Sequence, residues 1–221
     1  PDATDEGLRM HLILAADLGV VLARSGQRAE AKPVLARARE LASARLPGDQ
    51  GQAILMLHSG RFELGHDNQA ALVSLEQAQR LLAASPETDS TEMSASRHSL
   101  GTVYLELGRL DEAETQLRSA HAMFTQQYGR TDYDTLAALG SLALASARRE
   151  RYAAAVDLLA EGRSALQGKT ERKHLAMAAA LTGRQLQTAM LAGDLEAAEA
   201  ALSLLSDPDV SDPTVPNRHV L

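Results

Sequence analysis

The 221-residue sequence predicts an all-α fold, an α-solenoid of about five stacked helical hairpins. Two observations predict it. The same spacing of small and large apolar residues returns at a nearly constant interval along the chain. Aromatic residues make up only 3% of the sequence and tryptophan is absent, while alanine and leucine are abundant. That composition favours closely crossed helices over a β-sandwich, which uses valine, isoleucine and aromatic side chains.

The segment from Ser99 to Ala120 is the template for this repeat, and it predicts a helical hairpin. Apolar residues at helical spacing form one stripe over its first half. Gly108 follows as a C-cap, and two acidic residues then begin a second helix, where they suit the positive end of the helix dipole. Gly101 and Ala113 are small and are predicted to lie where the two helices cross.

This hairpin resembles a tetratricopeptide repeat (TPR). In that family a small residue is followed by a large one, an alanine, an apolar and a small residue, here Gly101, Tyr104, Ala113, Leu117 and Ala120. The same spacing recurs at Gly19, Leu22, Ala31, Leu35 and Ala38; Ser59, Phe62, Ala71, Leu75 and Ala78; Ala143, Ser146, Ala155, Leu159 and Gly162; and Leu186, Ala189, Ala198, Leu202 and Leu205. The resemblance implies a right-handed superhelix.

The first positions of these copies are 40, 42, 42 and 43 residues apart, longer than the common 34-residue form. The junction from Tyr128 to Ala143 resembles that of kinesin-light-chain-type TPRs, with Asp132-Tyr133 in place of His-Pro and Gly140-Ser141 in place of paired asparagines. The Ala-, Leu- and Arg-rich composition also resembles the TPR regions of bacterial serine/threonine protein kinases and, less closely, of large transcriptional regulators.

The periodicity predicts ten helices, at residues 7–25, 28–45, 50–64, 68–84, 91–107, 111–127, 133–148, 152–167, 171–191 and 195–206. Together they form one predicted repeat domain over residues 1–206. Residues 207–221 are rich in proline and aspartate and are predicted to be a disordered tail. Because the first residue is Pro1, we expect the sequence to be part of a longer chain.

Composition excludes several classes of function. The net charge of −7 argues against a nucleic-acid surface, which needs clustered lysine and arginine. The absence of cysteine removes disulfides and thiolate metal sites. No apolar run approaches the roughly 18 to 20 residues that cross a bilayer, and no signal-peptide pattern is present. We therefore expect no membrane insertion and a cytoplasmic location, with the periplasm left open.

No motif predicts catalysis, a metal site or a cofactor. The seven histidines lack the spacing of a helical zinc site. The segment 162–170 resembles a phosphate-binding loop, but five residues rather than four separate its glycines, and it follows a helix. The run Arg148–Arg151 has two interpretations, compensation of a helix dipole or recognition of an acidic partner. We expect no active site in this chain.

The family resemblance implies that the first helix of each hairpin lines a concave groove. Between the second and fourth repeats, the predicted groove residues are Met56, Gly60, Glu63, His98, Thr102, Glu106, Gly140, Leu144 and Arg148. Small and apolar residues beside polar ones suit an apolar helix or an extended peptide. The alternative is that these residues pack against neighbouring helices, or that the tail or a second copy of the chain fills the groove.

The sequence therefore predicts an interaction scaffold that binds a partner protein or peptide. We expect it to be the non-catalytic repeat region of a larger bacterial signalling protein, such as a serine/threonine kinase. One alternative is the ligand- or peptide-sensing region of a transcriptional regulator, and another is an enzyme, or a sensor that binds a small molecule in the groove. Homo-oligomerisation is left open.

Overall fold

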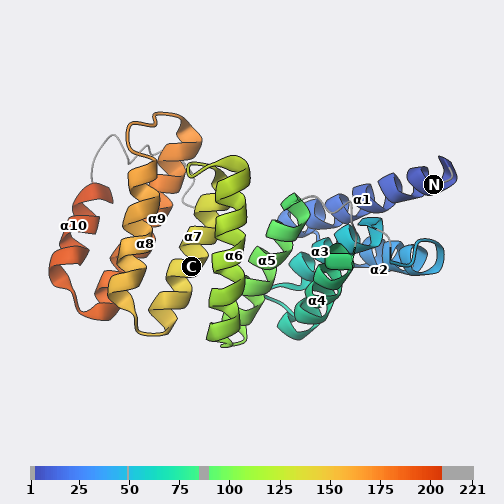
Figure 1. Cartoon of the computed structure of the whole chain (residues 1–221), viewed down its shortest axis with the longest axis horizontal. Coiled ribbons are helices and arrows are strands. Elements are labelled where there is room, and N and C mark those ends of the chain that lie inside the picture. Colours follow the sequence, from blue (N-terminus) through green and yellow to red (C-terminus); the bar gives the residue numbers. More distant parts are fainter. Residues whose placement is uncertain (1–2, 49, 85–89, 206–221) are drawn as a thin grey trace. The chain divides into compact units, whose positions relative to one another are not determined.

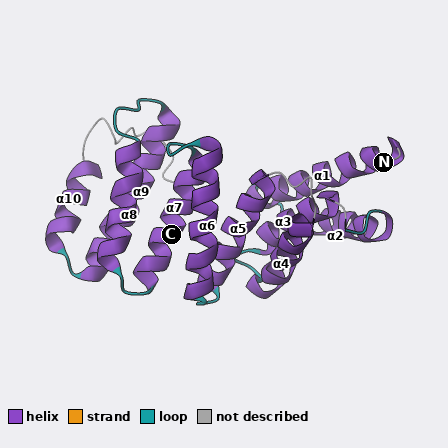
Figure 2. Cartoon of the chain, viewed as in Figure 1, coloured by secondary structure: helices purple, strands orange, loops and turns teal. Residues whose placement is uncertain are grey.

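A computed structural model describes residues 3–48, 50–84 and 90–205. Over these residues the chain contains ten α-helices and no strand (Figure 2). They are α1 (Ala3–Arg24), α2 (Arg28–Arg45), α3 (Gln50–Glu63), α4 (Asn68–Ala84), α5 (Ser90–Glu106), α6 (Leu110–Tyr128), α7 (Tyr133–Arg148), α8 (Tyr152–Ala165), α9 (Arg172–Ala192) and α10 (Leu195–Leu205). The predicted all-α class is confirmed, and the predicted tail, residues 207–221, lies outside the described residues.

The helices form two compact units, Pro1–Arg109 and Leu110–Leu221. In the first unit α1 packs on α2 and α3 packs on α4, while α3 also contacts α1, α2 and α5. In the second unit each helix from α6 to α10 packs on its neighbours in the chain, and α7 also contacts α9 (Figure 1). Such serial packing is the arrangement expected of helical repeats. The prediction of one domain over residues 1–206 stays a prediction.

The core follows the repeat positions that the sequence marks. The alanine near the start of the second helix is fully buried in four repeats, as Ala31, Ala71, Ala113 and Ala155. The leucine four residues later is buried too, as Leu35, Leu75, Leu117 and Leu159. A side chain on Gly19 would place its Cβ 2.6 Å from Cγ of Leu35. The small first position therefore lets α1 and α2 approach closely, as the repeat pattern requires.

The turns inside the hairpins share a left-handed residue. Gly26, Gly65, Gly108 and Gly193 have φ angles between 70° and 83°. After three of these turns, the next N–H donates to the carbonyl five residues earlier, as in a Schellman cap; for α9 this bond joins Asp194 N–H to Ala189 O at 3.0 Å. Glycine suits this conformation because it has no Cβ.

The turn between α7 and α8 has the same cap but no glycine. Glu150 occupies the left-handed position with φ 60°, and it is the only non-glycine residue with positive φ among the described residues. The N–H of Arg151 still donates to the carbonyl of Ser146 at 3.0 Å. The cap is therefore kept at the expense of backbone strain at Glu150.

The repeat junction before α7 is closed by a side-chain cap. The carboxylate of Asp132 accepts hydrogen bonds from the N–H groups of Asp134, at 2.9 Å, and Thr135, at 3.4 Å. These bonds satisfy donors that the first turn of a helix otherwise leaves unpaired. The aspartate that replaces histidine of the kinesin-light-chain-type junction thus fixes the start of α7.

The fifth repeat departs from the predicted phase. Leu202 stands where the other repeats have a buried leucine, yet it is 53% exposed. Instead α10 buries Ala198 and Ala201 and packs on α9. The first helix of this repeat has lost the small and large residues of the pattern, so the contact that fixes the rotation of the second helix elsewhere is missing here.

Candidate binding surface

Three predicted groove residues follow one another along α5. His98, Thr102 and Glu106 are spaced four residues apart, which places them on one helix face. His98 and Thr102 are half-buried, whereas Glu106 is exposed at the end of the helix. The Thr102 hydroxyl donates to the backbone carbonyl of His98 at 3.0 Å and thus serves its own helix. Glu106 is the most accessible member of this set.

The predicted groove residues of α3 are not surface residues of this kind. Met56 is only 6% exposed, so the expectation of an accessible side chain there is wrong. Gly60 is buried at the crossing with α4, where a Cβ would lie 2.4 Å from Cγ of Leu75. Glu63 is half-buried, and its carboxylate pairs with Arg28 of α2 at 3.0 Å. The cause is that α3 contacts α1, α2, α4 and α5.

On α7, one of the three predicted groove residues is buried and two are exposed. Gly140 is buried, and a Cβ there would lie 2.9 Å from Nη1 of Arg184 on α9. The expectation that Gly140 forms open groove surface is therefore wrong. Leu144 is 40% exposed, and Arg148 is exposed at the end of the helix. Toward its C-terminal end, α7 thus exposes an aliphatic side chain followed, one turn later, by a cationic one.

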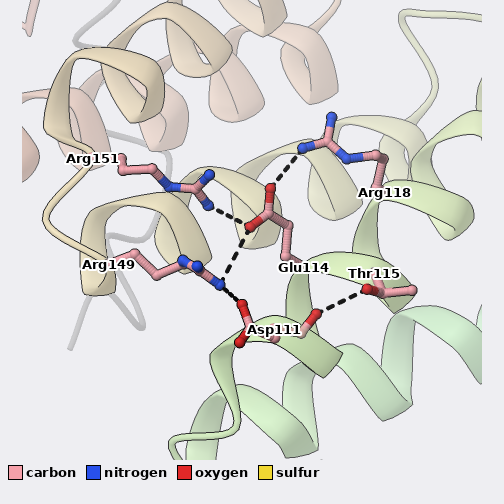
Figure 3. Close-up of polar contacts among 6 residues, drawn as sticks. All are labelled: Asp111, Glu114, Thr115, Arg118, Arg149 and Arg151. Atoms are coloured by element: carbon pink, nitrogen blue, oxygen red, sulfur yellow. Dashed lines mark hydrogen bonds and ion pairs between the residues drawn. The ribbon is translucent and has the colours of Figure 1, made fainter.

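The arginine-rich turn after α7 is tied to α6 by ion pairs (Figure 3). Arg149 donates to the Asp111 carboxylate, and Arg151 donates to Oε2 of Glu114. The other oxygen of Glu114 accepts from Arg118 at 2.7 Å. Two arginines of the predicted run therefore bind a neighbouring helix, a role that neither sequence interpretation included.

Glu114 is the centre of this network. Burial alone would raise the pKa of Glu114, but hydrogen bonds from Arg151 and Arg118 outweigh it and lower that pKa below its ordinary value. A hollow of about 510 Å³ opens beside Asp111, Glu114 and Arg118. Because the carboxylates and guanidinium groups in it already pair with one another, the hollow is a poor match for a single charged ligand.

A second hollow, of about 620 Å³, lies among α8, α9 and α10 and was missed by the sequence analysis. Its apolar lining consists of Ala160, Leu166, Leu175, Ala178 and Leu204, and its polar lining of Arg163, Ser164, Gln167, Lys169 and Thr182, with Gly168 at the turn. Both charged residues are basic. The segment 162–170 gave part of the signal, but only the packing of α10 brings Leu204 to it.

The first helix carries an apolar face on which no described helix packs. Its exposed residues recur at helical spacing and are Met10, Leu14, Leu18 and Val21. The positions equivalent to the last three in α7 are Ala138, Leu142 and Ala145, and all are buried. The helix α7 packs on α6, whereas no described helix precedes α1.

Two histidines are buried enough to have altered titration. Burial lowers the pKa of His58, Arg61 lowers it further, and Asp17, whose Oδ1 lies 3.4 Å from Nδ1 of His58, opposes the shift. Burial also lowers the pKa of His121, with Glu161 opposing. Over the described residues no three His, Asp or Glu side chains are grouped so that they could hold a metal ion.

Comparison with protein families places TPR repeats in the middle of the chain. The tetratricopeptide repeat model matches residues 63–126 and, overlapping them, 91–168. These residues include the central hairpin and the junction before α7. The sequence-based assignment of TPR repeats is therefore confirmed over this part of the chain.

Solved structures show the same fold over most of the chain. Two are crystal structures, one of them of a variant form, of a putative kinesin light chain from Podosopora anserina with nearly identical TPR-like repeats. Both are 22% identical to this chain. The variant form has a TM-score of 0.76 and covers 89% of this chain and 93% of its own length. The other has a TM-score of 0.75 and covers 91% of this chain and 94% of its own length. BtubC (BKLC) from P. vanneervenii is 14% identical, with a TM-score of 0.76 over 89% and 79%. The chain thus has the fold of these TPR-like helical repeats.

No curated protein matches the chain at a significant level. Within the described part of the chain, no helix combines the length and the apolar character that a membrane span requires.

Proposed function

We propose that this chain is a non-catalytic scaffold that binds a partner protein or peptide through the first helices of its hairpins. The observation that carries the proposal is the surface of α7, where exposed Leu144 is followed by exposed Arg148 on a helix whose other residues are largely buried. On α5, exposed Glu106 has the equivalent place near the end of a first helix. The TPR match over this region supports the assignment.

The chemistry of these residues describes the partner. An apolar side chain next to a charged one favours a peptide or helix that presents an aliphatic residue beside a charge of opposite sign. Leu144 with Arg148 suits an acidic partner, and Glu106 suits a basic one. We describe these as two separate contact surfaces, one in each unit.

The test is affinity capture of proteins and peptides from the source cells, quantified by mass spectrometry for the parent chain and its variants. Leu144→Glu is expected to weaken capture of the bound partner at least tenfold, about 1.4 kcal/mol of binding free energy. Glu106→Lys tests the surface in the first unit separately. Each variant must keep the helical circular dichroism of the parent.

Val73→Glu is the matched control, because Val73 is an exposed apolar residue on α4, the second helix of its hairpin. It should leave capture unchanged. If Leu144→Glu and Glu106→Lys both capture the same partners as the parent, the first helices are not the binding surface and the proposal fails.

The larger context is also part of the proposal. The Ala-, Leu- and Arg-rich composition supports a place within a bacterial cytoplasmic signalling protein such as a serine/threonine kinase. Reading the coding sequence on both sides of this chain tests it: a kinase domain is the expected finding, and a different catalytic or DNA-binding domain contradicts it.

A further inference from the structure

The hollow among α8, α9 and α10 is lined by two basic side chains and no acidic one, although Lys169 also interacts with Glu171, which lies outside the lining. Nη1 of Arg163 is buried and has no hydrogen-bond partner. Lys169 lines the same hollow, and no acidic residue does. A buried, unpaired guanidinium donor is unfavourable, so the site favours a ligand that brings a carboxylate. Leu175 and Leu204 add an apolar wall that suits an aliphatic side chain.

The sequence contains a segment of this chemistry directly after α10. Residues 206–212, Ser-Asp-Pro-Asp-Val-Ser-Asp, follow directly after α10 and contain three aspartates, one valine and no basic residue. Leu204, at the end of α10, is itself part of the lining. At about 3.3–3.6 Å per residue, Asp207 to Asp212 can reach positions roughly 7 to 25 Å from Leu205.

We infer that residues 206–212 bind in this hollow within the same chain, with aspartate carboxylates on Arg163 and Lys169 and with Val210 against the leucines. A short tether gives the segment an effective concentration in the millimolar range, so even a weak contact is occupied. An acidic peptide from another protein would have to displace the segment. The inference does not depend on the first-helix surfaces of the proposed function, and its test leaves them unchanged.

The first experiment uses the absence of cysteine in the chain. Gln167→Cys with Val210→Cys places one thiol at the hollow and one in the segment. Asp157→Cys with Val210→Cys is the control, because Asp157 is exposed on α8 but does not line the hollow. Under mild oxidation, the first pair is expected to form an intramolecular disulfide at least tenfold faster, measured by mass spectrometry.

Equal rates for the two pairs would overturn the inference. Disulfides that form only between chains would overturn it as well, because a second copy would then be the occupant.

The second experiment tests the charges in the Gln167→Cys/Val210→Cys chain. Asp207→Asn with Asp209→Asn should slow disulfide formation several-fold, and Lys169→Glu should do the same because it reverses a charge in the hollow. Adding Asp209→Lys to Lys169→Glu should restore part of the rate, which a purely structural effect would not do. The aspartates follow Leu205, the last residue of α10, in the sequence, so their variants change no residue of the lining and remain informative even if a change in the hollow unfolds the unit. The inference is contradicted if none of these charge changes alters the rate of disulfide formation.

Discussion

Glu150 is the residue whose backbone least suits its side chain. It takes the left-handed conformation that glycine takes in the equivalent turns of the other hairpins. We predict that Glu150→Gly stabilises the second unit by about 0.5–1 kcal/mol, because relief of strain exceeds the entropy that glycine adds to the unfolded chain. Urea unfolding followed by circular dichroism measures the change.

The reciprocal substitution is the control for this prediction. Gly193→Ala puts a Cβ into the same conformation at the C-cap of α9 and should destabilise the unit by about 1 kcal/mol. If both substitutions change stability in the same direction, strain at the turns does not determine these energies.

At the scale of helices, the crossing of α3 and α4 depends on a glycine. A Cβ at Gly60 would lie 2.4 Å from Cγ of Leu75, which is fully buried, and 3.1 Å from the carbonyl oxygen of Ala71. We predict that Gly60→Ala costs about 1–3 kcal/mol by forcing the helices apart. Thermal or urea unfolding of the purified chain provides the measurement.

Gly183, inside α9, is the matched control. A Cβ there meets no atom within 4 Å, so Gly183→Ala should stabilise the helix by about 0.5–1 kcal/mol. Similar losses of stability at Gly60 and Gly183 would show that helix crossing is not what distinguishes them.

The helices themselves could be predicted from the sequence because their evidence is local. Periodic alanine and leucine and the turn glycines place each helix within a few residues of its observed bounds. The environment of α3 could not be predicted in this way. The repeat pattern of the α3 sequence assigns Met56 and Gly60 to an open face, but contacts between α3 and four other helices bury both residues. Leu202 illustrates the same limit, since its exposure follows from the rotation of α10.

At the scale of the whole molecule, each unit contains a half-buried histidine that makes it sensitive to acid. The pKa values of His58 and His121 are lowered in the fold, so the unfolded chain binds protons first as the pH falls below about 6.5. Their contribution to stability is therefore complete above that pH and is lost as the pH falls through the folded-state pKa values. The pKa of Glu114 is also lowered in the fold, so stability decreases further when the pH falls below the ordinary pKa of a glutamate.

We predict that the urea concentration at the unfolding midpoint decreases as the pH is lowered from about 7.5 to 5.5. His58→Gln and His121→Gln should each make this decrease smaller. His66→Gln serves as the control, because His66 is exposed. A pH dependence that is unchanged in the double variant would assign the acid sensitivity to other groups.

The candidate site was predictable only in part. Leu144, Arg148 and Glu106 are exposed as their helical phase indicates. The hollow among α8, α9 and α10 was not predicted, because Arg163 and Leu204 are far apart in the sequence and no periodic pattern joins them. The pairing of Arg149 with Asp111 was missed for the same reason.

The serial packing of helices within each unit also bears on how fast the chain folds. Within each unit, contacting helices are no more than two apart in chain order. Such contacts close only short loops, so little chain entropy is lost before they form, and proteins with local contacts fold quickly. A hairpin can begin to fold as soon as its second helix has left the ribosome, before the rest of the chain has been synthesised.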